Sequence, residues 1–175
     1  MNITLKPADV RDLDAIADLY GAVCDGLADK PWNPGWRRDA FPTREDAARY
    51  LSGGWGYVAW AGGAPAGFIA VTPFPNAEGE PAAPSPETKE ALYIHVLAVH
   101  PGYQRQGVAS ILLDRAGALA GQEGAKALRL YVWEGNTPAI RTYEKSGFLR
   151  LGREDIGLGE FGLDWFYLYE KQLSQ

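Results

Sequence analysis

The feature that most constrains this chain is an almost continuous apolar run at residues 91–99, followed at once by a glycine-bearing helix start. Only Tyr93 and His95 interrupt the run with polar atoms, as is typical of a central strand covered on both faces. Behind Gly107, apolar residues recur at helical spacing: Val108, Ile111, Leu112, Ala116 and Leu119. A further strand is expected at residues 127–133, so this region predicts a strand–helix–strand unit with parallel strands.

Turn and cap residues divide the rest of the chain into shorter elements. Strands are predicted at residues 1–5, 56–60, 67–71, 148–153 and 161–169. Helices are predicted behind Asp9 or Asp12, at residues 45–51 behind Thr43, and behind Thr137, with Pro138 in the first position and Gly147 past the end. Residues 73–88 contain five prolines and predict a surface loop. The elements predict an α/β (α+β) fold with a mixed sheet and helices on its faces, in a single domain over residues 1–175.

Composition excludes several classes of function. The formal net charge is −5, so the chain has no general basic field for nucleic acid. Cys24 is the only cysteine, which excludes an internal disulfide framework and a cysteine-rich zinc site and favours a buried role in a reducing cytoplasm. No apolar run approaches the roughly 18 to 20 residues that span a bilayer, and no export signal is recognisable, so we expect a cytoplasmic protein without membrane contact.

Residues 104–109 form the first candidate motif. Backbone N–H groups in the first turn of the predicted helix have no partner within the helix, and the positive end of its dipole faces the loop. Gly107 and Ala109 are small where an anion must come close, and Arg105 adds a positive charge. The motif predicts a phosphate cradle, although such a turn taken alone is also typical of an ordinary helix start.

The second candidate motif begins about thirty residues later. Ala139 and Tyr143 are four residues apart and share a helix face, and Asn136 precedes that helix on the approach to the same crevice. Taken alone, the tyrosine is typical of packing and the asparagine of a turn. The two motifs in this order are stronger evidence for a functional site than either motif alone.

Together, Gln104-x-x-Gly107-x-Ala109 and Asn136-x-x-Ala139-x-x-x-Tyr143-x-x-x-Gly147-Phe148 closely resemble the GNAT superfamily of acetyl-CoA-dependent N-acetyltransferases, over about residues 92–148. The resemblance implies a mostly antiparallel sheet of about seven strands, acetyl-CoA as cosubstrate and no metal. It further implies that the coenzyme A pyrophosphate is held by the loop of Gln104, Arg105, Gln106, Gly107, Val108 and Ala109.

The same resemblance assigns roles to four other residues. Backbone groups of Leu97 and Val99, with the side chain of Asn136, are implied to bind the pantetheine arm, and Tyr143 to lie beside the sulfur. A phenol ordinarily has a pKa near 10, above that of a thiol, so Tyr143 is the candidate acid for the departing thiolate. Direct transfer without a covalent enzyme intermediate is expected, because Cys24 lies outside this pattern.

The candidate base is His95. Some members of the family carry a glutamate on the central strand, but the face that alternation predicts here has none: Tyr93, His95, Leu97 and Val99. The run from His95 to His100 resembles the serotonin N-acetyltransferases, in which strand histidines relay the amine proton through water. Only one of that pair is matched, because Tyr93 occupies the other position, and a lone histidine here is also compatible with a core residue.

Several alternatives remain open at this level. A non-catalytic acyl-CoA sensor would need the phosphate loop but neither Tyr143 nor His95, so their presence favours an enzyme. A dinucleotide-binding domain is disfavoured, because the second and third glycines of its fingerprint are missing after Gly107. The acceptor is expected to be the primary amine of a small molecule or a peptide, and an aminoglycoside-like sugar and a protein N-terminus or lysine remain open as alternatives. Acidic residues near the closing hairpin agree with a cationic acceptor, and tryptophans with an aromatic one. A homodimer is compatible with the sequence.

Overall fold

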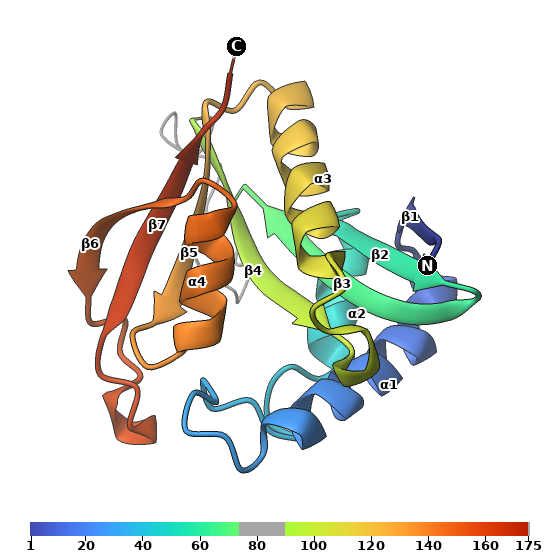
Figure 1. Ribbon diagram of the computed structural model, residues 1–175, viewed down its shortest axis with the longest axis horizontal. Coiled ribbons are helices and arrows are strands. Elements are labelled where there is room, and N and C mark those ends of the chain that lie inside the picture. Colours follow the sequence, from blue (N-terminus) through green and yellow to red (C-terminus); the bar gives the residue numbers. More distant parts are fainter. Residues whose placement is uncertain (74–89, 175) are drawn as a thin grey trace.

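The computed structural model describes residues 1–73 and 90–174, and their strands form one seven-stranded sheet in the order β1-β2-β3-β4-β5-β7-β6 (Figure 1). The strands are β1 (Ile3–Pro7), β2 (Gly56–Ala61), β3 (Ala64–Thr72), β4 (Ala91–Val99), β5 (Ala127–Trp133), β6 (Leu149–Glu154) and β7 (Phe166–Gln172). Among these described strands, only β4 and β5 pair in parallel, as a strand–helix–strand connection requires. The predicted fold class, a mixed and mostly antiparallel sheet with flanking helices, is confirmed.

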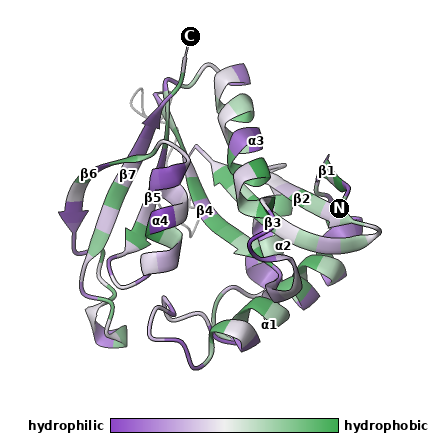
Figure 2. Cartoon of the chain, in the orientation of Figure 1, coloured by the Kyte–Doolittle hydropathy of each residue, from purple (hydrophilic) through white to green (hydrophobic). Residues whose placement is uncertain are grey.

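Helices cover both faces of the sheet and create two apolar cores. The α-helices are α1 (Leu13–Leu27), α2 (Arg44–Ser52), α3 (Val108–Gln122) and α4 (Thr137–Lys145). Residues of α1 and α2 form one core with Val58, Phe68 and Val96, whereas residues of α3 and α4 pack with Ile69 and Leu128. The central strands β3 and β4 are accordingly mostly hydrophobic, and the edge strand β6 ends in hydrophilic residues (Figure 2). No helix in the described part of the chain is long and apolar enough to cross a membrane.

Local capping differs from the sequence expectation at two helices. Asp9 caps a short 3-10 turn (Val10–Asp12) that precedes α1, and Asp12, the N-cap residue of α1, makes no side-chain capping bond there. Thr137 is the first residue of α4 and not its cap; Asn136 caps the helix by accepting from the N–H of Ala139. Asparagine was the better candidate, because its carbonyl oxygen accepts as readily as a hydroxyl and it lay one residue earlier.

Strand boundaries also differ in places. The last strand begins at Phe166 and not at residue 161, because the chain first forms a 3-10 turn (Gly159–Phe161) that ends at Gly162 with φ +76°. The first strand is displaced by two residues, to Ile3–Pro7. The predicted proline-rich loop at residues 73–88 lies outside the described residues, apart from Pro73.

Strands β4 and β5 separate halfway along their length. Their pairing runs only from Ala91 with Ala127 to Ile94 with Leu130. Beyond these residues β4 stays with β3 while β5 stays with β7, and the two strands diverge (Figure 1). The sheet therefore opens at its centre, next to the end of β4 that leads into α3.

Candidate active site

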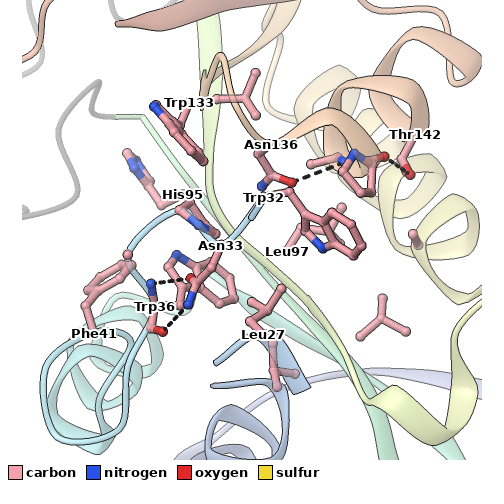
Figure 3. Close-up of a pocket in the computed structure, with 18 of the residues that line it drawn as sticks. Leu27, Trp32, Asn33, Trp36, Phe41, His95, Leu97, Trp133, Asn136 and Thr142 are labelled. Atoms are coloured by element: carbon pink, nitrogen blue, oxygen red, sulfur yellow. Dashed lines mark hydrogen bonds between the residues drawn. The ribbon is translucent and has the colours of Figure 1, made fainter. Parts of the chain in front are cut away.

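A cavity of about 2470 Å³ lies where β4 and β5 diverge (Figure 3). Tyr93, His95, Leu97 and Val99 of β4 all line it, but they do not share one face as alternation predicted: Leu97 and Val99 pack with the core of α3 and α4, whereas His95 stacks on Tyr50 in the core of α1 and α2. Tyr131 and Trp133 of β5 line it as well. Sequence reasoning missed these two aromatic residues, although their spacing of two residues on a strand placed both on one face.

A shift in strand register lies at the centre of this cavity. Consecutive residues Ala70 and Val71 of β3 pair with Val96 and Ile94 of β4, so that His95 is an extra residue in β4, as in a β-bulge. Bulges bend a strand and re-aim its side chains. The bulge therefore accounts for the divergence of β4 from β5 and directs the His95 ring into the opening.

The bulge also changes the side that each backbone group of β4 faces. Before it, the carbonyl of Glu90 accepts from β5 with an N···O distance of 3.1 Å; after it, the N–H of His100 donates to β3 at 2.9 Å. In a regular strand, the backbone N–H and C=O groups of residues two apart face the same neighbouring strand. Residues 90 and 100 would therefore both face β5 in a regular β4, but residue 100 faces β3 instead. The N–H and C=O groups of Leu97 and Val99 therefore face the edge that β5 has left.

The loop before α3 has the geometry of an anion cradle. Arg105 and Gly107 both have positive φ, +60° and +82°, and Gly107 is the N-cap residue of α3. Backbone N–H groups gathered by such alternating conformations form concave anion sites, and the helix dipole reinforces them. Among the described residues, a Cβ on Gly107 would meet nothing within 4 Å, so no close neighbour excludes a larger side chain. Glycine is favoured here because of the positive φ.

Five of the six predicted loop residues line the cavity: Gln104, Arg105, Gly107, Val108 and Ala109. The side chain of Gln106 instead turns back, and its Nε2 donates to the carbonyl of Gly102 at 3.2 Å. Two basic residues of α4, Arg141 and Lys145, also line the cavity and were missed in the sequence. Their spacing of four residues on the helix that carries Tyr143 was the available signal.

The second motif borders the same cavity. Asn136 and Tyr143 both line it. The Oδ1 atom of Asn136 accepts from Ala139 N at 3.4 Å, and its amide nitrogen lies on the cavity side (Figure 3). The Tyr143 ring packs edge-on against Phe148 with centroids 5.9 Å apart. Burial raises the pKa of Tyr143 above its ordinary value, so the phenol keeps its proton.

His95 is held from two sides. Its Nε2 lies 2.7 Å from Thr72 Oγ1, and its ring stacks on Tyr50 with centroids 6.2 Å apart and an angle of 11° between the planes. Tyr50 and Thr72 are buried, so they fix the imidazole in one orientation. The other histidine, His100, accepts from Gly102 N through Nδ1 at 3.0 Å and does not line the cavity within the described part of the chain.

Cys24 lines the cavity from α1 but is only 3% exposed. Its Sγ is directed at the carbonyl of Phe41, 4.0 Å away, and burial raises the pKa of the thiol. A protonated, buried thiol is a poor nucleophile, so Cys24 remains a packing residue.

We therefore expect Cys24→Ala to retain turnover within about twofold of the unchanged protein, because no acyl group passes through this thiol. Rapid-quench kinetics on the unchanged protein should show no burst of thiol release. A burst that disappears in Cys24→Ala would contradict direct transfer.

The chain resembles known acetyltransferases in sequence and in fold. Residues 22–148 match the family model of the acetyltransferase (GNAT) family. Among solved structures, a predicted phosphinothricin N-acetyltransferase is 23% identical with a TM-score of 0.73, and the comparison covers 99% of this chain and 100% of that chain. The N-acetyltransferase from Staphylococcus aureus Mu50 is 20% identical with a TM-score of 0.75, over 99% and 100%.

A further similar structure was solved with its cofactor acetyl-CoA: yncA from Salmonella typhimurium, 19% identical, TM-score 0.75, over 100% of this chain and 96% of that chain. At these identities the structures establish a common fold. The family match spans well over half of the sequence and contains both motifs that border the cavity. The chain therefore belongs to the acetyltransferase (GNAT) family, and it is an acetyl-CoA-dependent N-acetyltransferase.

Proposed function

We propose that this protein transfers the acetyl group of acetyl-CoA directly to the primary amine of a small molecule, with His95 as base and Tyr143 as acid. One observation carries the proposal: the phosphate loop, the backbone edge at Leu97 and the side chains of His95 and Tyr143 border a single cavity. A sensor would require only the first two of these features.

Each bond change has a candidate group in the cavity. The amine nitrogen attacks the thioester carbonyl, a C–N bond forms, and the C–S bond breaks as the tetrahedral intermediate collapses. The amine proton passes to His95, directly or through water, and Tyr143 gives its proton to the departing sulfur. Because burial raises the pKa of Tyr143, this donor is protonated over the whole neutral range.

Coenzyme A has candidate contacts along the other side of the cavity. Its pyrophosphate fits the loop of Gln104, Arg105, Gly107, Val108 and Ala109, and the backbone of Gln106 belongs to the same turn. Leu97 and Val99 offer backbone groups to the amides of the pantetheine arm, and Asn136 offers a side-chain amide. These contacts would hold the thioester carbonyl between His95 and Tyr143.

Calorimetric titration with acetyl-CoA, followed by thiol release against a panel of amines and basic peptides, tests the function. Peptides belong in the panel, because a structure 19% identical to this chain is the ribosomal-protein-S18-alanine N-acetyltransferase from Escherichia coli. We expect binding, with turnover on small amines. Turnover on peptides alone would favour a protein acetyltransferase, and binding without any turnover would favour a sensor.

The role of His95 is tested by the pH dependence of the rate. A histidine acts as a base only in its neutral form, so kcat/KM should fall toward acidic pH as the base becomes protonated. We expect His95→Ala to lower kcat/KM by about 10²-fold and to remove this acidic limb. His100→Ala is the matched control, since it removes the chain's other imidazole and should keep the limb. An unchanged limb in His95→Ala would exclude His95 as the base.

A further inference from the structure

We infer that the acceptor is a monoamine carrying an aromatic ring, an inference that rests on the proposed acetyl transfer. Six aromatic side chains in the cavity lining define what we call the aromatic half: Trp32, Trp36, Phe41, Trp133, Phe161 and Phe166. They come from three segments far apart in the sequence, namely the α1–α2 loop, β5, and β7 with the turn before it.

The α1–α2 loop is built to hold its tryptophans at the cavity. Asn33 Oδ1 accepts from Trp36 N at 2.8 Å, while Asn33 Nδ2 donates to Trp36 O at 3.1 Å. The Trp36 ring then packs edge-on against Phe41, with centroids 6.1 Å apart. Trp32 and Trp36 both line the cavity from this loop (Figure 3).

The opposite wall approaches the same loop. A Cβ built on Gly35 would lie 3.2 Å from Leu163 Cδ1, so the α1–α2 loop touches the segment between β6 and β7. That segment contributes Leu158, Phe161 and Leu163 to the lining. The two segments therefore border an open chamber with rings on both sides, which suits a flat, apolar group.

The chamber leads to the proposed base. Trp36 and Phe41 pack against the apolar core of α1 and α2, which contains Tyr50. Tyr50 in turn stacks on His95. An aromatic ring among these side chains would carry an amine on a short linker to the imidazole, opposite the phosphate loop.

Charges in the lining argue against a polycationic acceptor. Among the described residues, two of the three carboxylates that line the cavity are neutralised: Asp25 pairs with Arg38 at 2.6 Å, and Asp46 pairs with Arg49. The third, Glu160, is exposed. A polyamine or a lysine-rich peptide would need several unpaired carboxylates, whereas a monoamine needs none once it has lost its proton.

Steady-state kinetics with saturating acetyl-CoA tests the inference, using 2-phenylethylamine, 2-cyclohexylethylamine, butylamine and spermidine. We expect kcat/KM for 2-phenylethylamine to exceed that for butylamine and spermidine at least about tenfold. In Trp36→Ala this preference should fall about tenfold. Trp36→Phe should keep most of it, because a ring remains. Asn33 binds only the backbone of residue 36, so its hydrogen bonds survive both changes.

Trp165→Ala is the matched control. Trp165 is 39% exposed, packs on Arg153 at 4.1 Å, and does not line the cavity formed by the described residues. Calorimetric affinity for acetyl-CoA should be equal in all these variants, which verifies folding. Equal kcat/KM for the four amines, a preference for spermidine, or an equal loss in Trp165→Ala would overturn the inference. Failure to bind acetyl-CoA at all would instead contradict the proposed function.

Discussion

Replacing Gly107 by valine should lower the affinity for acetyl-CoA by at least about hundredfold. Gly107 has φ +82° at the start of α3, a conformation that a β-branched residue adopts only at a cost of about 1–3 kcal/mol. The loop would relax by rotating that backbone, which disperses the N–H groups that we propose to bind the pyrophosphate. Isothermal calorimetry at constant salt measures the effect.

The same helix offers a control for backbone strain. Gly124, just beyond the other end of α3, has φ +79° and, like Gly107, no described atom within 4 Å of an added Cβ. Gly124→Val should therefore lower thermal stability about as much as Gly107→Val does and leave the acetyl-CoA affinity unchanged. If both variants lose affinity equally, the loss reflects stability, and the phosphate loop is not at Gly107.

Tyr143→Phe should lower kcat by about 10²- to 10³-fold with an acetyl-CoA dissociation constant within about twofold. Only the hydroxyl is removed, so the edge-on packing on Phe148 survives. Without the phenol, the thiolate must leave unprotonated or take its proton from water. Because the pKa of Tyr143 is raised, the unchanged protein should lose no rate through deprotonation of this phenol below about pH 10.

Tyr20→Phe is the matched control for removal of a buried hydroxyl. Within the described residues, the Tyr20 hydroxyl is buried without a hydrogen-bond partner, and the residue lies in the core of α1 and α2, outside the cavity lining. We expect kcat to stay within about twofold. Unchanged turnover in Tyr143→Phe would remove this tyrosine from the mechanism.

Local patterns were sufficient to predict the parts of the site that lie close together in the sequence. Three patterns each depend on neighbouring residues alone: the apolar run of β4, the glycine before α3 and the spacing from Asn136 to Tyr143. Their elements, and the crevice that these elements share, could therefore be predicted. The cap of α4 was misassigned by one residue, because Asn136 and Thr137 both suit that position.

Features that depend on tertiary contacts could not be predicted. The residues around His95 do not indicate a bulge, because the register of β4 is set by its pairing with β3. The aromatic half likewise arises from the approach of Gly35 to Leu163, residues far apart in the chain. Aromatic side chains in these segments were visible in the sequence, but their common cavity was not.

In the binding mode that we propose, the pantetheine arm takes the place that β5 leaves beside β4 after the bulge at His95. Leu97 and Val99 turn their backbone groups to the edge that β5 has left, so an amide-bearing ligand laid along that edge would complete the hydrogen bonding of β4. The amides of these two residues should then exchange with solvent much more slowly when coenzyme A is bound. Release of coenzyme A would leave this edge of β4 without those hydrogen bonds again. The local stability of the sheet would therefore change with each turnover.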